Sequence, residues 1–141
     1  MASAATSVAA NFAVAQRTLS VFKSGLGYGS VSSTPAGVSC GATCAYSFDH
    51  GALVILQAVS AAHSSFSGWA GAGCSGNDTC LLTMNAAKSV TANFALDQHT
   101  LTVTFDGAGS GGVTSSPSTG INCTATCSAP FYYGELVTLT P

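Results

Sequence analysis

Charged residues are scarce in this sequence. They make up 6% of its 141 residues, against about a quarter in an ordinary globular protein. Three cations stand against five acids, and the cations form no basic patch. We therefore expect no nucleic-acid partner, because binding to a phosphate backbone depends on clustered Lys and Arg. A neutral polar surface also leaves little charge repulsion between molecules that stack on one another.

Long apolar runs are absent as well. The longest, Ala52 to Leu56, is far shorter than the ~18 residues of a membrane helix, so we expect no membrane span. The N-terminus has neither the charged start nor the apolar core of a signal peptide. Since the cysteines indicate an oxidising compartment, we expect the natural N-terminus to lie elsewhere.

The sequence also lacks the residue patterns of catalysis and metal binding. The histidines, His50, His63 and His99, have no Ser or Asp constellation at matching positions, and the acids are scattered. The cysteine spacings are C-x3-C and C-x5-C, whereas structural zinc sites typically use C-x2-C pairs that converge. We therefore predict that the protein is not an enzyme and that it has no metal site and no cofactor.

Six cysteines are present, and they fall into three close pairs. An even count at tight spacings indicates disulfides formed outside the cytosol. Four cysteines can join in three ways, but local pairing is favoured because the last pair stands by itself in an incomplete repeat. The predicted bridges are Cys40–Cys44, Cys74–Cys80 and Cys123–Cys127.

An internal repeat organises the chain. SVAANFAVAQRTLSV, from Ser7 to Val21, returns as SVTANFALDQHTLTV, from Ser89 to Val103, at an offset of 82 residues. Each copy closes one repeat and opens the next, and after an insertion at Thr119 the offset becomes 83. We predict three segments: residues 1–17 as the closing strand of a preceding repeat plus a linker, 18–96 as a complete β repeat, and 97–141 as the first half of a following repeat.

Apolar residues alternate with polar ones through most of each repeat, which predicts half-buried strands. The expected fold is all-β, with tandem small five-stranded modules, sandwich-like or β-grasp-like, joined by short linkers into a rod. The glycine-rich segments Lys23–Ser30 and Asp106–Gly112 are expected to be hairpin turns. The predicted core comprises Phe66, Trp69, Leu82, Met84, Val90 and Phe94, and the predicted inter-repeat strand carries Val8, Ala10, Phe12 and Val14.

The order of these motifs carries a family likeness. It runs Leu-x-Val, glycine-rich turn, Val-x-Ser, Pro, Cys-x3-Cys, Phe-x2-Gly and Val-x-Leu-x-Ala, followed by Phe-x-Gly-Trp-x-Gly, a cysteine pair, Met-x-Ala-Ala-Lys-Ser-Val and Thr-Ala-x-Phe. This pattern resembles the divergent internalin-type B-repeat of bacterial secreted and surface proteins, completely from Leu19 to Phe94 and in its first half from Leu101 to Leu139. The resemblance implies small β modules strung in stalks, adhesins or fibres, at an extracellular or cell-surface location. It supplies no catalytic residues.

Two functions follow as hypotheses. The first is a disulfide-stapled structural repeat of a surface protein or filament, assembled end to end with neighbouring repeats or identical chains. The alternative is a carbohydrate- or host-binding adhesin module that uses a glycan or surface ligand, for which the candidate residues are Tyr28, Tyr46, Tyr132 and Tyr133. Either the chain is a window of a longer array, or residues 7–14 are donated as a strand to the open half-repeat of another chain.

Overall fold

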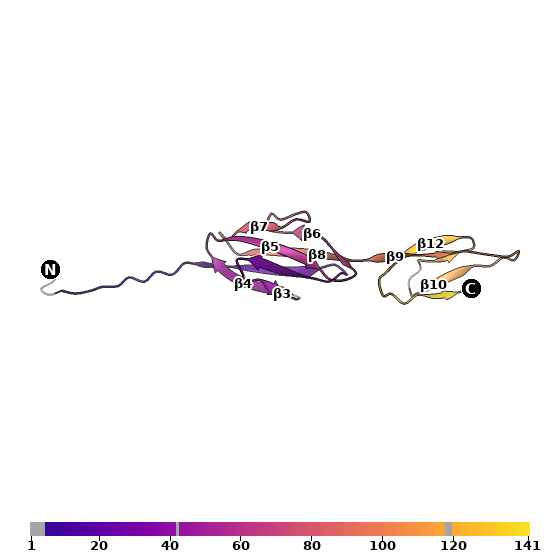
Figure 1. The fold of residues 1–141 in the computed structure, drawn as a ribbon, viewed down its shortest axis with the longest axis horizontal. Coiled ribbons are helices and arrows are strands. Elements are labelled where there is room, and N and C mark those ends of the chain that lie inside the picture. The colour runs from indigo at the N-terminus through magenta and orange to yellow at the C-terminus, as the bar shows by residue number, and fades with distance from the viewer. Residues whose placement is uncertain (1–4, 42, 118–119) are drawn as a thin grey trace.

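The computed structural model describes residues 5–41, 43–117 and 120–141, without the side chains of Cys40 and Thr43 (Figure 1). Over these residues the fold is all-β, with strands and no helix, which confirms the predicted class. The strands group into two successive units along the chain. We call strands β1 to β8 the complete module and strands β9 to β13 the half-module.

The complete module consists of two four-stranded sheets that face each other across one core. The order of strands is β4-β1-β8-β6 in the first sheet and β3-β2-β5-β7 in the second. Their bounds are β1 Gln16–Ser24, β2 Gly29–Thr34, β3 Ser39–Cys40, β4 Thr43–Asp49, β5 Leu53–Ser60, β6 Ser64–Ala70, β7 Cys80–Thr83 and β8 Lys88–Leu96.

Alternating apolar residues on the central strands build this core. Leu19 and Val21 of β1 are fully buried beside Val90 and Phe94 of β8. These two strands run parallel, with Val21 opposite Val90, although nearly the whole module separates them in sequence. A parallel pair requires a long crossover, and the strands between them, which build the second sheet and the outer strands of the first, supply it.

The half-module repeats the first part of this plan. Strand β9 pairs with β12, as β1 pairs with β4, and a three-stranded sheet in the order β11-β10-β13 corresponds to β3-β2-β5. Among the described residues no strand of the half-module corresponds to β6, β7 or β8. The bounds are β9 Gln98–Val103, β10 Val113–Ser116, β11 Asn122–Cys123, β12 Cys127–Tyr132 and β13 Thr138–Thr140.

Two details of the predicted modules were wrong. Over its described residues the complete module has eight strands rather than five, because β3 ends and β4 begins at the Cys40/Cys44 pair and because β6 forms in spite of its glycine, with a register shift between Phe66 and Gly68. The glycine-rich segment after β1 is not a hairpin turn. Strand β1 pairs with β4 and β8, whereas β2 pairs with β3 and β5, so this segment carries the chain from one sheet to the other.

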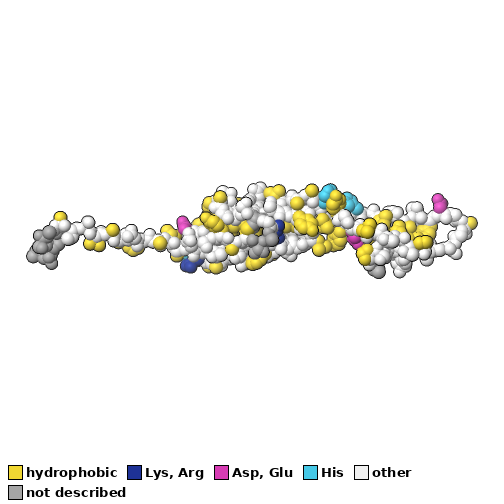
Figure 2. All heavy atoms as spheres, turned by 90° about the horizontal axis from the view of Figure 1, so that it is seen from below, with side chains coloured by type: hydrophobic (Ala, Val, Ile, Leu, Met, Phe, Trp, Pro, Cys, Tyr) yellow, Lys and Arg dark blue, Asp and Glu magenta, His cyan; other side chains and the backbone are white. Residues whose placement is uncertain are grey.

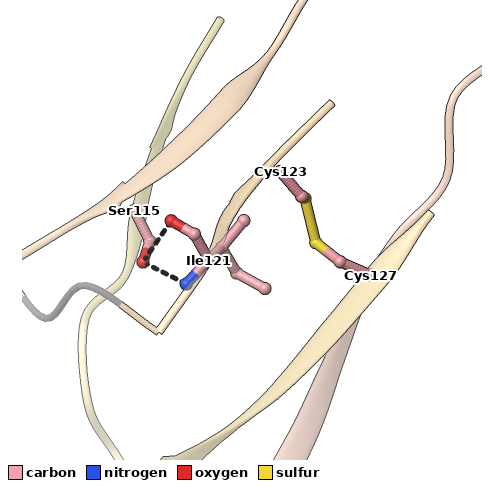
Figure 3. Close-up of a disulfide and its surroundings, with 4 residues drawn as sticks. All are labelled: Ser115, Ile121, Cys123 and Cys127. Carbon is pink, nitrogen blue, oxygen red and sulfur yellow. Dashed lines mark hydrogen bonds between the residues drawn. A yellow bond between two sulfur atoms is a disulfide. The ribbon is translucent and has the colours of Figure 1, made fainter. Parts of the chain in front are cut away.

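Disulfides tie the two sheets of each unit together. Cys74, which follows β6 of the first sheet, is bonded to Cys80 of β7 in the second. In the half-module Cys123 of β11 is bonded to Cys127 of β12 (Figure 3). Cys44 is also disulfide-bonded, but its predicted partner Cys40 has a side chain outside the described residues.

A serine closes the proline loop of both units in the same way. The Ser115 hydroxyl accepts a hydrogen bond from the backbone N–H of Ile121 at 2.9 Å, beside the disulfide (Figure 3). In the complete module the Ser33 hydroxyl accepts the N–H of Val38, also at 2.9 Å. The half-module therefore keeps this loop of its complete counterpart.

The two units lie end to end in an elongated molecule (Figure 1). Only Asp97 separates β8 from β9. At the opposite end of the complete module, residues 5–15 project as an extended, exposed segment that belongs to no sheet.

Candidate assembly site

One edge of strand β9 has no strand beside it within the described part of the chain. In the complete module β1 is bordered by β4 on one side and by β8 on the other. Its counterpart β9 is bordered by β12 alone. Unpaired N–H and C=O groups along such an edge form a template for another strand.

Strand β9 is also shorter than β1. The last three residues of β1, Phe22 to Ser24, pair with Thr91 to Asn93 of β8, and the antiparallel pairing with β4 reaches no farther than Phe22. The corresponding residues 104–106 lie outside β9 and form no strand. The residues by which β9 is shorter than β1 therefore correspond largely to those that pair with β8 in the complete module.

The inner face of the half-module is only partly covered. Leu19, Val21, Val54 and Leu56 are each 0% exposed in the complete module. Of their counterparts, Leu101, Val103 and Val137 are partly exposed, and Leu139 is 41% exposed. Beside these residues lies an open groove of about 570 Å³, lined by Leu101, Phe131, Leu136, Val137 and Leu139 among others.

Three glycines of the complete module lie directly against β8. A Cβ atom added to Gly25 or Gly27 would meet the backbone of Phe94 or Ala95, and one added to Gly29 would meet the Phe94 ring. The Gly27 N–H donates to the Phe94 carbonyl at 3.0 Å. Glycine is needed here because a neighbouring backbone approaches closely.

The half-module keeps all three glycines without the strand that they accommodate. Gly107, Gly109 and Gly111 stand at an offset of 82 from Gly25, Gly27 and Gly29. A Cβ atom added to any of them would have no neighbour within 4 Å. Within the described residues, no backbone therefore lies against these glycines as β8 lies against Gly25 and Gly27.

The exposed segment 5–15 has the sequence of β8. Its apolar residues Val8, Ala10 and Phe12 correspond to Val90, Ala92 and Phe94, which are 1%, 0% and 1% exposed. In the N-terminal segment Val8 is 94% and Phe12 is 95% exposed. A strand pattern that is buried in one copy is therefore fully open to solvent in the other.

Tyr133 makes two contacts at the junction between the two units. Its backbone N–H donates to the Asp97 carbonyl at 2.8 Å, and its ring stacks on His63 of the complete module with centroids 3.6 Å apart. The N–H of His50, which corresponds to Tyr133, donates to the Ala15 carbonyl in the same way. Histidines lie near the junction in Figure 2, on a surface with few charged groups.

The predicted core residues lie together in the complete module. Trp69, Leu82, Met84, Val90 and Phe94 are buried, and Phe66 is partly buried with its ring 5.0 Å from that of Trp69. The Trp69 indole donates to the Asp78 carbonyl at 2.6 Å. The candidate sugar-binding tyrosines are all exposed, but Tyr46 packs beside Phe48 and Tyr133 is stacked on His63.

Sequence reasoning missed the role of the glycines. Their recurrence at a fixed offset could have revealed this role, but closely spaced glycines are usually interpreted as a turn.

In the described residues no three His, Cys, Asp or Glu side chains are grouped as metal ligands would be. The same residues include no helix long and apolar enough to cross a membrane.

A family model for the divergent InlB B-repeat domain matches residues 26–98, just over half of the chain. The chain therefore belongs to this family, as the motif order predicted. The match covers β2 to β8, and β1 lies before it. No curated protein and no solved structure matches the chain. Membership suggests a repeat module of a surface or secreted protein, a setting with which the two described disulfides agree.

Proposed function

We propose that this chain is a structural repeat of an extracellular bacterial surface protein or filament, in which successive modules stand end to end. The observation that carries the proposal is the junction. One residue joins β8 to β9, and the hydrogen bond from Tyr133 to Asp97 recurs as that from His50 to Ala15. A one-residue connection with a repeated backbone contact favours a stiff rod over flexibly linked domains.

The role we propose is mechanical rather than catalytic. The ionisable groups differ between equivalent positions, with Arg17 replaced by His99 and His50 by Tyr133. What the two units share is structural: inward-facing apolar residues, the serine-closed loop and a disulfide. Disulfides across the sheets suit small modules exposed outside the cell, because such modules bury too little apolar surface to be robust alone.

Small-angle scattering of the purified, oxidised chain at low concentration tests the rod. We expect a maximum dimension that matches two modules in line plus the N-terminal segment. Antibodies against the chain should also label the cell surface or its appendages in electron micrographs. A distribution of interdomain angles typical of flexible linkers, or labelling confined to the cytoplasm, would contradict the proposal.

The second candidate, an adhesin module that binds carbohydrate, is favoured by the exposure of Tyr28, Tyr46, Tyr132 and Tyr133. Exposed aromatic rings stack on sugars. A glycan array tests this candidate directly. Binding that disappears when these tyrosines are changed to alanine would establish it. An array without a signal would leave the structural role as the remaining candidate.

A further inference from the structure

We propose that the open edge of β9 binds residues 7–14 of a second copy of this chain as a parallel strand, so that chains join head to tail. This inference rests on the proposed structural role and names its partner. The occupant is argued from the complete module, where the same sequence pattern, as β8, already fills the equivalent position beside β1.

The register of the joint follows from the equivalence of the strands. Val21 lies opposite Val90 and Lys23 opposite Ala92 in the β1–β8 pair. Adding the offset of 82 residues to β1 and subtracting it from β8 places Val103 opposite Val8 of the second chain. In the same register Phe105 lies opposite Ala10 of the second chain. The paired region would extend β9 through residues 104–106, where β1 continues and β9 does not.

The glycines supply the space for this strand. Phe94 packs against Gly29, and the N–H of Gly27 donates to the Phe94 carbonyl. In the joint, Phe12 of the second chain would pack against Gly111 and accept the N–H of Gly109. The open space over both glycines leaves room for the incoming strand.

The geometry makes the joint intermolecular and open-ended. The N-terminal segment and β9 lie at opposite ends of the complete module (Figure 1), so a chain cannot close on itself. Residues 7–14 lead directly into β1 of their own chain, just as β8 leads into β9. Each added chain therefore continues the line of modules, and a heterologous contact of this kind generates a filament.

The contact adds one strand to the half-module, in the position that β8 fills in the complete module. The face of the half-module that gains cover is that of Leu101 and Val103 of β9. Val8, Ala10 and Phe12 lose part of their exposure in the joint. Because both surfaces are nearly uncharged, association should change little with salt.

Light scattering and electron microscopy of the oxidised full chain test the proposal. We expect filaments for the parent. The change Phe12→Asp should raise the concentration needed for assembly by at least about a hundredfold, because it removes a buried aromatic ring and would bury a charge. Ala13→Asp is the matched control, since its counterpart Ala95 is exposed on β8 and the charge would face solvent.

A second pair of variants tests the acceptor. Gly109→Ala should block assembly, because its methyl group would meet the incoming backbone, while the free chain has open space there. Gly112→Ala should assemble normally, since the complete module carries Ser30 at the equivalent position. Mixing Phe12→Asp with Gly109→Ala should give one-to-one dimers, because one intact donor and one intact acceptor remain.

Hydrogen exchange identifies the strand in the assembly. Residues 5–14 and 104–106 should gain protection together when filaments form. A parent chain that stays monomeric at high concentration, filaments that survive both blocking variants, or assemblies with residues 5–14 unprotected would each overturn the proposal. None of these results would disturb the proposed rod, which scattering from the monomer and surface labelling test separately.

Discussion

The complete module and the half-module place similar residues at equivalent positions in two different environments. Leu19 and Val21 of β1 are fully buried, whereas Leu101 and Val103 of β9 are partly exposed. The two units share the serine-closed loop and the pairing of the first strand with its antiparallel neighbour, although β9 ends three residues earlier than β1. Alternation therefore sets which way a residue faces, and strands from far along the chain decide whether it is buried.

The difference has a thermodynamic consequence. Among the described residues, the core of the half-module contains three buried residues, Ile121, Ala129 and Phe131, with six partly buried apolar residues packed against it. Fourteen buried residues of the described part of the chain form the core of the complete module. Units of about 40 residues usually need a staple to remain folded, so the Cys123–Cys127 bridge should matter more to its unit than Cys74–Cys80 does.

The largest expected effect comes from making the complete module resemble the half-module. Trp69→Ala removes a side chain that is 5% exposed and packs on Phe66. We expect a loss of about 3–5 kcal/mol in the unfolding free energy of the complete module. Chemical denaturation followed by circular dichroism measures it, with the exposed Tyr28→Ala as control. Parent-like stability would mean that the ring is not part of the core.

A matched pair of glycine changes sharpens the comparison. Gly27→Ala forces a methyl group onto the backbone of Ala95, and we expect it to cost about 3 kcal/mol, the upper part of the range for overpacking. Gly109→Ala meets open space and should leave the stability of the monomeric chain within about 0.5 kcal/mol. Fluorescence of Trp69, the single tryptophan, follows the unfolding of the complete module. Equal losses in the two variants would show that the glycines serve only local turns.

This pair also marks the limit of prediction from the sequence. The all-β class, the repeat and the likeness to the family could be predicted because alternation, spacing and motif order are local signals. The pairing of β1 with β8 could not, since no local pattern tells which of several similar strands become neighbours. The glycines were therefore interpreted as hairpin turns, and only the packed sheets reveal that they face a strand.

Strands β4 and β6 show a second limit. Strand β4 was not among the five expected strands, because the close pair Cys40/Cys44 was interpreted as a disulfide loop. In β6 Gly68 interrupts the period, because the register shifts between Phe66 and Gly68. A bulge moves later residues to the other face, so a simple alternation test fails there although the strand is intact.

Removing the disulfides should separate the two units. On the loop-entropy argument each short bridge stabilises its unit by about 2 kcal/mol. Replacing Cys74 and Cys80 by alanine should weaken the complete module and leave it folded. Replacing Cys123 and Cys127 should unfold the half-module, because its core is too small to absorb the same loss. Amide exchange resolved by residue measures both. A half-module that keeps its protection without the bridge would contradict this expectation.

The smallest effect concerns the junction. Tyr133→Ala removes the ring that stacks on His63 but keeps the backbone N–H that donates to Asp97. An aromatic pair contributes about 0.5–1.5 kcal/mol beyond its buried area, so neither unit should lose much stability of its own. The expected result is a wider range of angles between the units, measured by NMR residual dipolar couplings of the two sheets.

A double-mutant cycle with His63→Ala isolates the stacking, because both single changes remove the same contact. If the contact stiffens the junction, the double variant should be no more mobile than either single variant. Unchanged mobility in both single variants would instead assign the stiffness to the backbone bond and the one-residue linker. In that case the same stiffness should hold at the Ala15 joint, where His50 makes the corresponding backbone bond and Arg17 is the side chain in contact with it, its Nε 3.3 Å from the His50 Nδ1.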